Sequence, residues 1–289
     1  MALQIATTGQ LDEAQRIAIA QARFTAEHND PCVNTIEKLT LKQGEKSVTV
    51  PKVAQMEARE LEDGVDLVDS EDIGMTTVEL TTGEVGLKVI LTDKLVRQEN
   101  ESVFRMVGRQ MGDAKSRKED TDVIALFSAL NGGTVLGEDG KYMTLQNIAA
   151  CLAHAKSHKF PRPISIVHHP NAVHALTTSL SPTAGTYPIP SGLSAEMLKD
   201  FWAITIDGVA VFHDGNIGKL IGYDSGYGAI YSKNAMCIIR SKEWGTERER
   251  DASLRATELV MVADYGCFEL DDGYGAPMQY EIGDPSTSN

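Results

Sequence analysis

Apolar side chains recur at helical spacing through residues 92–130, a stretch of 39 residues without proline. One face is marked by Leu95, Val103, Met106, Val107, Met111, Val123, Leu126, Phe127 and Leu130. The spacing predicts a helix that Thr92 can cap and Asn131-Gly132-Gly133 can end, although Gly108 and Gly112 could break it. Such a helix spans roughly 58 Å, whereas a compact chain of this length is about 50 Å across. The pattern therefore predicts an extended subunit.

Two stretches that flank an acidic segment alternate between apolar and polar residues, which predicts strands. They are "EKSVTVPKV" (45–53) and "TTVELTTGEVGLKVIL" (76–91), and Pro51 restricts the first to a sheet edge. We interpret residues 45–91 as one long β-hairpin whose middle cannot build a core by itself. Upstream, residues 11–27 predict a helix with a small apolar face, which Asn29-Asp30-Pro31 ends.

The pattern of residues 144–240 predicts a mixed α/β block. We expect helices over 144–158 and from Pro170, a short buried strand at 164–167, and a hairpin that turns at Asp207-Gly208. Further strands are expected from 243 to 281. Residues 177–194 are rich in Ser, Thr, Pro and Gly, which is typical of a long functional or mobile loop.

The charge of the chain argues against nucleic-acid binding through a basic surface. Its 289 residues carry a formal net charge of −14. Residues 57–84 hold ten Asp or Glu against Arg59 alone, a local net charge of −9, and residues 256–289 carry seven more acids with no Lys or Arg. Such a chain lacks the counterion release that drives binding to phosphate backbones. The 42% of hydrophobic residues excludes disorder throughout the chain.

The cysteines and the chain start point to a protein used where it is made. Cys32, Cys151, Cys237 and Cys267 are widely spaced and form no CxxC pair, which favours free thiols in a reducing compartment. "MALQIATTGQ" lacks the pattern of a signal peptide, and no apolar run is long enough for a membrane helix. We therefore expect a soluble protein with no membrane partner.

Five of the seven histidines lie between residues 154 and 174 and raise the question of a metal site. His154 and His158 share a helix face and could chelate one ion. The metalloprotease pattern needs a Glu where Ala155 stands, and no Cys or carboxylate falls at ligand spacing. His168 and His169 are neighbours at a strand end, so their side chains point to opposite faces. We favour packing and capping roles, and predict no metal and no cofactor.

No motif for catalysis is found in the remainder of the chain. "GYDSGYGAIY" (222–231) lacks a third glycine at Tyr231 for the dinucleotide pattern, so a turn is favoured. There is no phosphate loop and no GxSxG nucleophile motif, and "DDGYG" (271–275) is too short for a calcium loop. "ERERD" (247–251) alternates in charge and could either pair with a neighbouring chain or form a solvated edge. We predict no enzyme and no catalytic residue.

The order of the elements resembles the major capsid protein of tailed bacteriophages, the Hong Kong 97 fold. Three stretches carry the resemblance. "VILTDKLVRQ" is similar to the entry of the family's spine helix, "RKEDTDVIALFSALNG" to the end of that helix, and "ISIVHHPNAVHAL" to a strand and helix-opening proline of the axial domain. The resemblance covers nearly the whole chain and implies an α+β subunit with an N-terminal arm, an extended loop, a spine helix, and peripheral and axial domains.

The resemblance also implies domain limits. They are an N-terminal arm over 1–44, an extended loop over 45–91, a peripheral domain over 92–140 and 241–289, and an axial domain over 141–240. Ser181–Gly192 would lie near the centre of a capsomer. Met1 lies only some 44 residues from the extended loop, too few for the scaffolding segment of many members, so the resemblance implies a separate scaffolding protein or none. Lys52 lies in the loop where some members cross-link, but no Asn or Glu partner can be matched, so we expect non-covalent assembly.

The function implied is self-assembly into hexamers and pentamers of a phage head that encloses double-stranded DNA. The expected location is the virion, after assembly in the host cytoplasm, with a portal and decoration proteins as further partners. Three alternatives remain open: an encapsulin-like nanocompartment shell, a tail-tube or decoration protein, and a His-dependent metalloenzyme.

Overall fold

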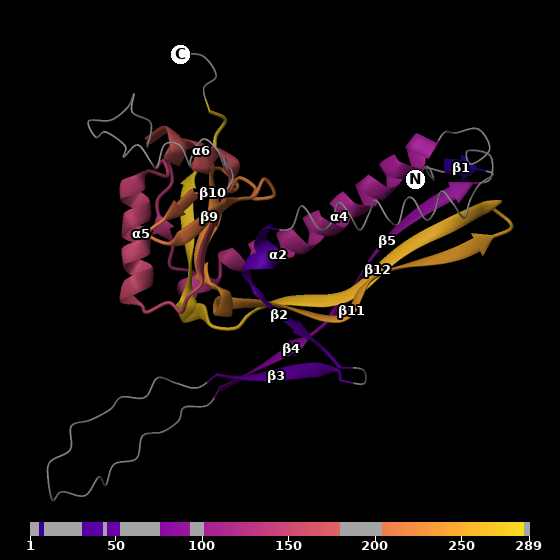
Figure 1. Cartoon of the computed structure of the whole chain (residues 1–289), viewed down its shortest axis with the longest axis horizontal. Helices are drawn as coiled ribbons and strands as arrows, with labels where there is room; N and C mark the ends of the chain where they lie inside the picture. The colour runs from indigo at the N-terminus through magenta and orange to yellow at the C-terminus, as the bar shows by residue number, and fades with distance from the viewer. Residues whose placement is uncertain are drawn as a thin grey trace, which may run out of the picture.

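The computed structural model describes residues 6–8, 31–42, 45–52, 76–92, 101–179 and 204–285. They form helices and mixed sheets, an α+β chain as the sequence predicts. The helix expected over 11–27 and the loop at Ser181–Gly192 lie outside these residues. Figure 1 shows an elongated molecule in which a long helix joins a unit built on one sheet to a second, extended sheet. Within the described residues no helix is both long and apolar enough to cross a membrane.

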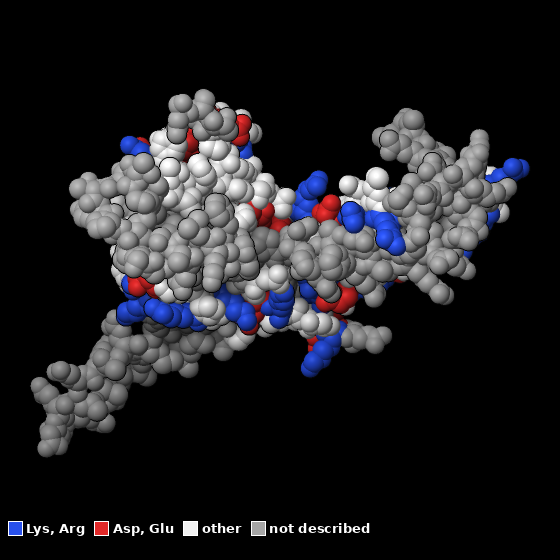
Figure 2. All heavy atoms as spheres, turned by 45° about the horizontal axis from the view of Figure 1, so that its top comes forward, with Lys and Arg blue, Asp and Glu red and all other residues white. Residues whose placement is uncertain are grey.

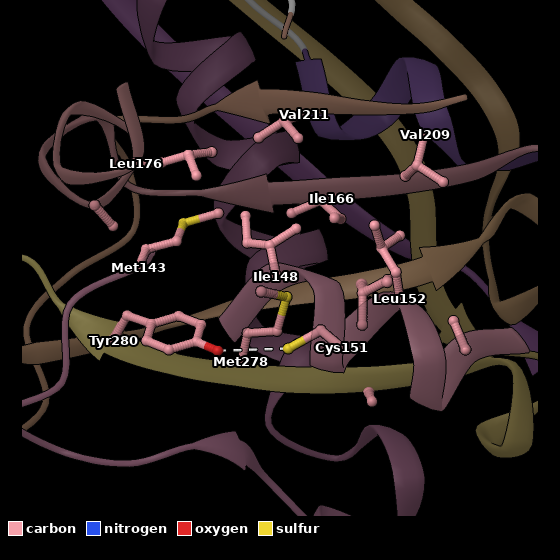
Figure 3. Packing of buried hydrophobic residues seen from close by; sticks show 14 of the residues in the cluster. Met143, Ile148, Cys151, Leu152, Ile166, Leu176, Val209, Val211, Met278 and Tyr280 are labelled. Atoms are coloured by element: carbon pink, nitrogen blue, oxygen red, sulfur yellow. Dashed lines mark hydrogen bonds between the residues drawn. The ribbon is translucent and has the colours of Figure 1, made fainter. Parts of the chain in front are cut away.

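One unit is built on a six-stranded sheet with the order β6-β13-β10-β7-β9-β8. Its strands are β6 (Leu136–Gly137), β7 (Ile164–His168), β8 (Ile204–Ile206), β9 (Val209–His213), β10 (Ser225–Ser232) and β13 (Gly275–Glu281). Helices α5 (Leu145–Ser157) and α6 (Pro170–Ser179) cover one face, where Ile148 and Leu176 pack around Ile166 (Figure 3).

The local signals in this unit act as the sequence predicts. Thr144 caps α5, because its Oγ1 accepts a hydrogen bond from the backbone N–H of Asn147 (3.3 Å). Pro170 is the first residue of α6, where its missing N–H costs no hydrogen bond. β8 and β9 form a hairpin through Asp207 and Gly208, whose φ angles of 54° and 76° are typical of a type I′ turn.

The second sheet has five strands in the order β1-β5-β12-β11-β2. They are β1 (Ala6–Thr8), β2 (Glu37–Thr40), β5 (Gly83–Thr92), β11 (Met236–Asp251) and β12 (Ala256–Glu269). β11, β12 and β5 are antiparallel and form its long centre, and β1 and β2 join the edges in parallel. The short helix α2 (Pro31–Thr35) precedes β2, and single 3-10 turns connect the units: η1 (Leu130–Gly133), η2 (Lys233–Ala235) and η3 (Asp272–Tyr274).

A separate two-stranded hairpin, β3 (Ser47–Lys52) with β4 (Thr76–Thr81), lies below the five-stranded sheet in Figure 1, and its Leu80 packs with Cys237 and Ile239 of β11. The sequence predicts a hairpin over 45–91, but β5, the last strand of that range, is not part of it. β5 follows β4 after Thr82 and pairs with β12 rather than with β3. Alternating residues fit either partner, so the pattern of 76–91 could not separate two strands that belong to different sheets.

The long helix α4 runs from Glu101 to Phe127, and its 27 residues span about 40 Å. Thr92 is the last residue of β5 and pairs with Ala256. Residues 93–100 lie outside the described part of the chain, so the helix start at Thr92 stays a prediction. Gly108 and Gly112 lie inside α4 without breaking it. After the helix, Asn131 and Gly132 adopt positive φ, which ends the helical path as predicted.

The six-stranded sheet combines strands from three segments that are distant in the sequence. β13 lies within 241–289, a segment expected to accompany α4, yet it pairs with β10 from Ser225 to Tyr231 in the six-stranded sheet. β6, from the segment 92–140, pairs with β13 in the same sheet. Periodicity identifies a strand but not its neighbour, because the pairing is decided by hydrogen bonds between distant segments.

Buried polar contacts fix α4 on the five-stranded sheet. Glu119 is fully buried, and its Oε2 accepts a hydrogen bond from Arg240 Nη2 (2.9 Å) while its Oε1 accepts one from the indole N–H of Trp244. One turn along the helix, Asp122 Oδ2 accepts a hydrogen bond from the hydroxyl of Tyr265 (2.9 Å). The two acids thereby hold α4 to both central strands, β11 and β12.

The Glu119 contact predicts a stability difference between two charge variants. Glu119→Gln keeps the side-chain size but removes the charge that faces Arg240, so unfolding in urea should cost about 2–4 kcal/mol less. Lys242→Ala breaks the exposed pair with Glu247 on the same strand and should change stability much less. Equal losses in the two variants would contradict a dominant role for the buried contact.

Candidate functional site

The structure brings two of the candidate histidines together. His154 and His158 share one face of α5, as predicted, with ring centroids 4.0 Å apart. Burial, and then the neighbouring His158, lowers the pKa of His154. The Nδ1 of His158 lies 3.0 Å from the carbonyl oxygen of His154, a contact that caps the helix end. The one described group of three metal-ligating side chains contains neither histidine.

His168 and His169 lie in different environments, as expected for neighbours at the end of β7. His168 is fully buried, and its Nδ1 accepts a hydrogen bond from the backbone N–H of His169 (2.9 Å). Its ring packs against Tyr280, with centroids 5.8 Å apart, and any side chain at Gly228 would collide with it. His169 Nδ1 accepts a hydrogen bond from the N–H of Asn171 at the start of α6 (3.2 Å). These contacts give one ring a packing role and the other a capping role.

A buried cluster that sequence reasoning missed lies where α2, α4 and the end of β9 meet. Its members are Cys32, Asp120 and Asp214, whose ligand atoms lie within 4.8 Å of one another. The thiol of Cys32 donates to Asp214 Oδ2 (3.2 Å), and Asp214 Oδ1 accepts from the N–H of Asn216 (2.8 Å). Burial, followed by these negative neighbours, raises the pKa of Tyr231 well above its usual value. The residues are 88 and 94 positions apart along the chain, so spacing gave no signal.

The face of the five-stranded sheet opposite α4 is rich in acids. Register places Glu84 beside Asp264, Glu247 beside Val260, and Glu249 beside Glu258. Lys88 pairs with Glu258, and Lys242 with Glu247 (2.7 Å). Arg248 instead lies beside Leu259, on the face that packs against α4 through Met111 and Met261. The predicted alternation of "ERERD" between two faces is therefore confirmed.

Four exposed basic residues gather at one end of the six-stranded unit, where β7 begins and β10 ends. The exposed residues there are Lys156, Lys159, Arg162 and Lys233. Lys233 is linked to this end by the hydrogen bond from its N–H to the carbonyl of Pro163 (3.2 Å). Figure 2 shows basic side chains in a band along the lower edge of the same unit. One of these residues, Lys156, pairs with Asp207, so the charge of this end is partly balanced within the unit.

The burial of His168 predicts a stability loss in acid. Burial lowers its pKa from 6.5 to about 3 in the folded chain. Below pH 6.5 the unfolded chain binds a proton at this ring and the folded chain does not, so stability falls as the pH drops from 6.5 toward 3. The contribution is up to about 1.4 kcal/mol per pH unit. Urea unfolding between pH 7 and pH 4 measures it.

Two asparagine variants isolate this ring from the other titrating groups. His168→Asn keeps an acceptor near Nδ1 but cannot titrate, so it should lose part of the pH dependence. His174→Asn, at an exposed position on α6, should keep the wild-type dependence. An unchanged pH slope in His168→Asn would show that another group causes the loss.

Comparison with known proteins gives matches in structure alone. No family model matches the chain, and no curated protein matches its sequence. The capsid of Ralstonia phage GP4 is similar with a TM-score of 0.69 and 12% identity, over 88% of this chain and 89% of that chain. The capsid of cyanophage Pam1 is similar with a TM-score of 0.67 and 10% identity, over 89% and 93%.

A cellular shell is also similar to the chain. The encapsulin complex from Synechococcus elongatus matches with a TM-score of 0.61 and 10% identity, over 91% of this chain and 92% of that chain. Together with the long helix, the two sheets and the projecting hairpin, these similarities show that the chain has the Hong Kong 97-like fold that the sequence resemblance implies.

Proposed function

We propose that the chain is the major subunit of a closed phage head, built from hexamers and pentamers of itself around double-stranded DNA. The observation that carries the proposal is the extent of the similarity to phage capsids, 88% of this chain and 89% of the GP4 chain. A function that uses the whole architecture is favoured over one confined to a single unit. The proposed role is structural and not enzymatic.

The shape of the subunit supports assembly through many separate contacts. A two-stranded hairpin is marginally stable by itself. One face of β3–β4 gains a core on the five-stranded sheet, where Leu80 packs with Leu41 and Ile239. Its other face is exposed and would gain stability by lying on another copy. Modest contacts of this kind sum over a closed lattice, and each is weak enough to let misplaced subunits leave.

The charge of the subunit suits a container for DNA. A wall with a net charge of −14 per chain does not hold the genome by counterion release, so packaged DNA stays free to move. We propose that the wall facing the DNA is formed by acidic surface, either from residues 57–84 or from the face of the five-stranded sheet opposite α4. The basic end of the other unit would then contact protein rather than DNA.

The proposal includes a division of labour along the chain. We assign the unit with the six-stranded sheet to the axial domain, so that β6 and β13 join residues 141–240, and the remaining sheet and α4 to the peripheral domain. Residues 1–44 and 45–82 would be the arm and the extended loop. A separate scaffolding protein, a portal and decoration proteins are proposed partners. The virion is the proposed location, reached after non-covalent assembly in the host cytoplasm.

A second candidate is an encapsulin-like compartment that encloses cargo proteins. The similarity to the Synechococcus elongatus encapsulin complex favours it, since the match covers 91% of this chain. The two candidates share the shell and differ in its content.

Negative-stain microscopy of the purified full chain tests the proposed function. We expect closed polyhedral shells, or flat sheets of hexamers, when the chain is expressed alone or with a scaffolding protein. Nuclease-resistant nucleic acid in particles from infected cells supports the phage head, and a co-purifying protein in its place supports the compartment. Monomers or dimers under both expression conditions would overturn either form of shell.

A further inference from the structure

One turn of the six-stranded unit presents an apolar side chain to solvent on a fixed backbone. Ile221 is completely exposed and Tyr223 is more than half exposed. The N–H of Tyr223 donates to the carbonyl of Leu220 (3.1 Å), and Gly222 supplies the positive φ of 85° that this turn needs. Lys219 and Asp224 form an ion pair (2.7 Å) across the base of the turn. Ile221 and Tyr223 together give this turn a small exposed apolar surface on a defined backbone.

A hollow of about 390 Å³ lies on the same unit, beside α5. It is lined by Leu136, Gly137, Glu138, Lys141, Asn147, Ala150, Cys151 and Tyr280. The hydrogen bond between Cys151 and Tyr280 (3.4 Å, dashed in Figure 3) joins two of its lining residues. Tyr142, before α5, and Leu145, its first residue, are two further exposed apolar side chains of this segment. The hollow therefore combines apolar side chains with a charged rim of Glu138 and Lys141, and can receive a side chain from outside.

The exposed turn and the hollow lie on opposite faces of the sheet. The loop that carries the turn is anchored by Ile217, which packs with Phe127 of α4 and Val167 of β7. The helix beside the hollow packs on the other face, through Ile148 against Ile166. In Figure 1, α5 and α4 accordingly lie on the two sides of this unit. The turn thus cannot reach the hollow of its own chain.

The two features nevertheless lie at the same height along the sheet. The N–H of Glu281 donates to the carbonyl of Lys141 beside the hollow (2.8 Å), and the N–H of the next residue, Ile282, donates to the carbonyl of Asp224 in the turn (2.8 Å). A head-to-tail contact between copies forms a closed ring when the rotation from one copy to the next closes.

We propose that the Ile221 turn of one copy inserts into the hollow beside α5 of the next copy and so links the axial units of a capsomer into a ring. Each of the two surfaces carries one basic and one acidic side chain. They are Lys219 and Asp224 at the turn, which pair with each other in the free chain, and Glu138 and Lys141 at the hollow, so the proposed contact would place opposite charges side by side. The proposal rests on the proposed shell function and names the surfaces that would build its rings.

Disulfide trapping in assembled particles tests the contact. In a Cys151→Ser background, which removes the native thiol beside the hollow, Ile221→Cys is combined with Ala150→Cys and the particles are oxidised. We expect a ladder of covalent oligomers on a non-reducing gel, up to the size of a capsomer, that collapses to monomer with reductant. Each single variant should remain monomeric, and so should the control pair Leu254→Cys with Ala150→Cys, whose first position is an exposed leucine of the second sheet.

A charge at the turn gives a second measurement. Ile221→Asp should weaken each contact roughly tenfold or more, because it replaces an apolar side chain that the contact would bury with a charged one. Particle yield should then fall, while the purified chain should unfold as wild type does.

The outcomes separate the contact from the shell itself. Particles without a ladder, a ladder from the Leu254 control, a cross-link to another protein, or wild-type yield from Ile221→Asp would each overturn the proposed contact. Wild-type chain that forms no particles would overturn the proposed function instead.

Discussion

Glu119 is held inside the molecule by Arg240 and Trp244, and this contact fixes the helix that both sheets share. α4 lies on β11 and β12 along most of its length, and its last turns, with Val123 and Phe127, enter the core of the six-stranded unit. A buried carboxylate without its cation would be costly, so the helix has one favoured position on the sheet. The relative orientation of the two units follows from that position.

A subunit that closes a lattice must present its contact surfaces at fixed angles. The Ile221 turn and the hollow beside α5 belong to one unit, while the hairpin β3–β4 and the acidic sheet face belong to the other. Because α4 packs in the cores of both units, a contact made at a surface of one unit sets the direction of the contact surfaces on the other. The individual contacts can then stay weak, since geometry rather than affinity selects the closed assembly.

The residues with the most chemical promise contribute to packing. His168 is buried as a neutral ring against Tyr280 and Gly228, and burial lowers its pKa to about 3. Cys32 donates a hydrogen bond to Asp214 in the junction of α2 with α4, and burial raises the pKa of Cys237 to about 12. Burial thus moves the pKa values of His168 and Cys237 away from neutral pH, which suits a chain whose proposed work is to hold a shape.

The sequence by itself determined the local elements and the fold. Alternation predicted β3 and β4, Thr144 and Pro170 predicted the starts of α5 and α6, Asp207-Gly208 predicted a turn, and the order of motifs indicated the Hong Kong 97 fold. Tertiary structure decided which strands pair: it gave Thr92 to β5, β13 to the six-stranded sheet, and Cys32, Asp120 and Asp214 to one cluster. Local signals depend on residues a few positions apart, whereas pairing and burial depend on contacts between segments that are distant in the sequence, which periodicity does not record.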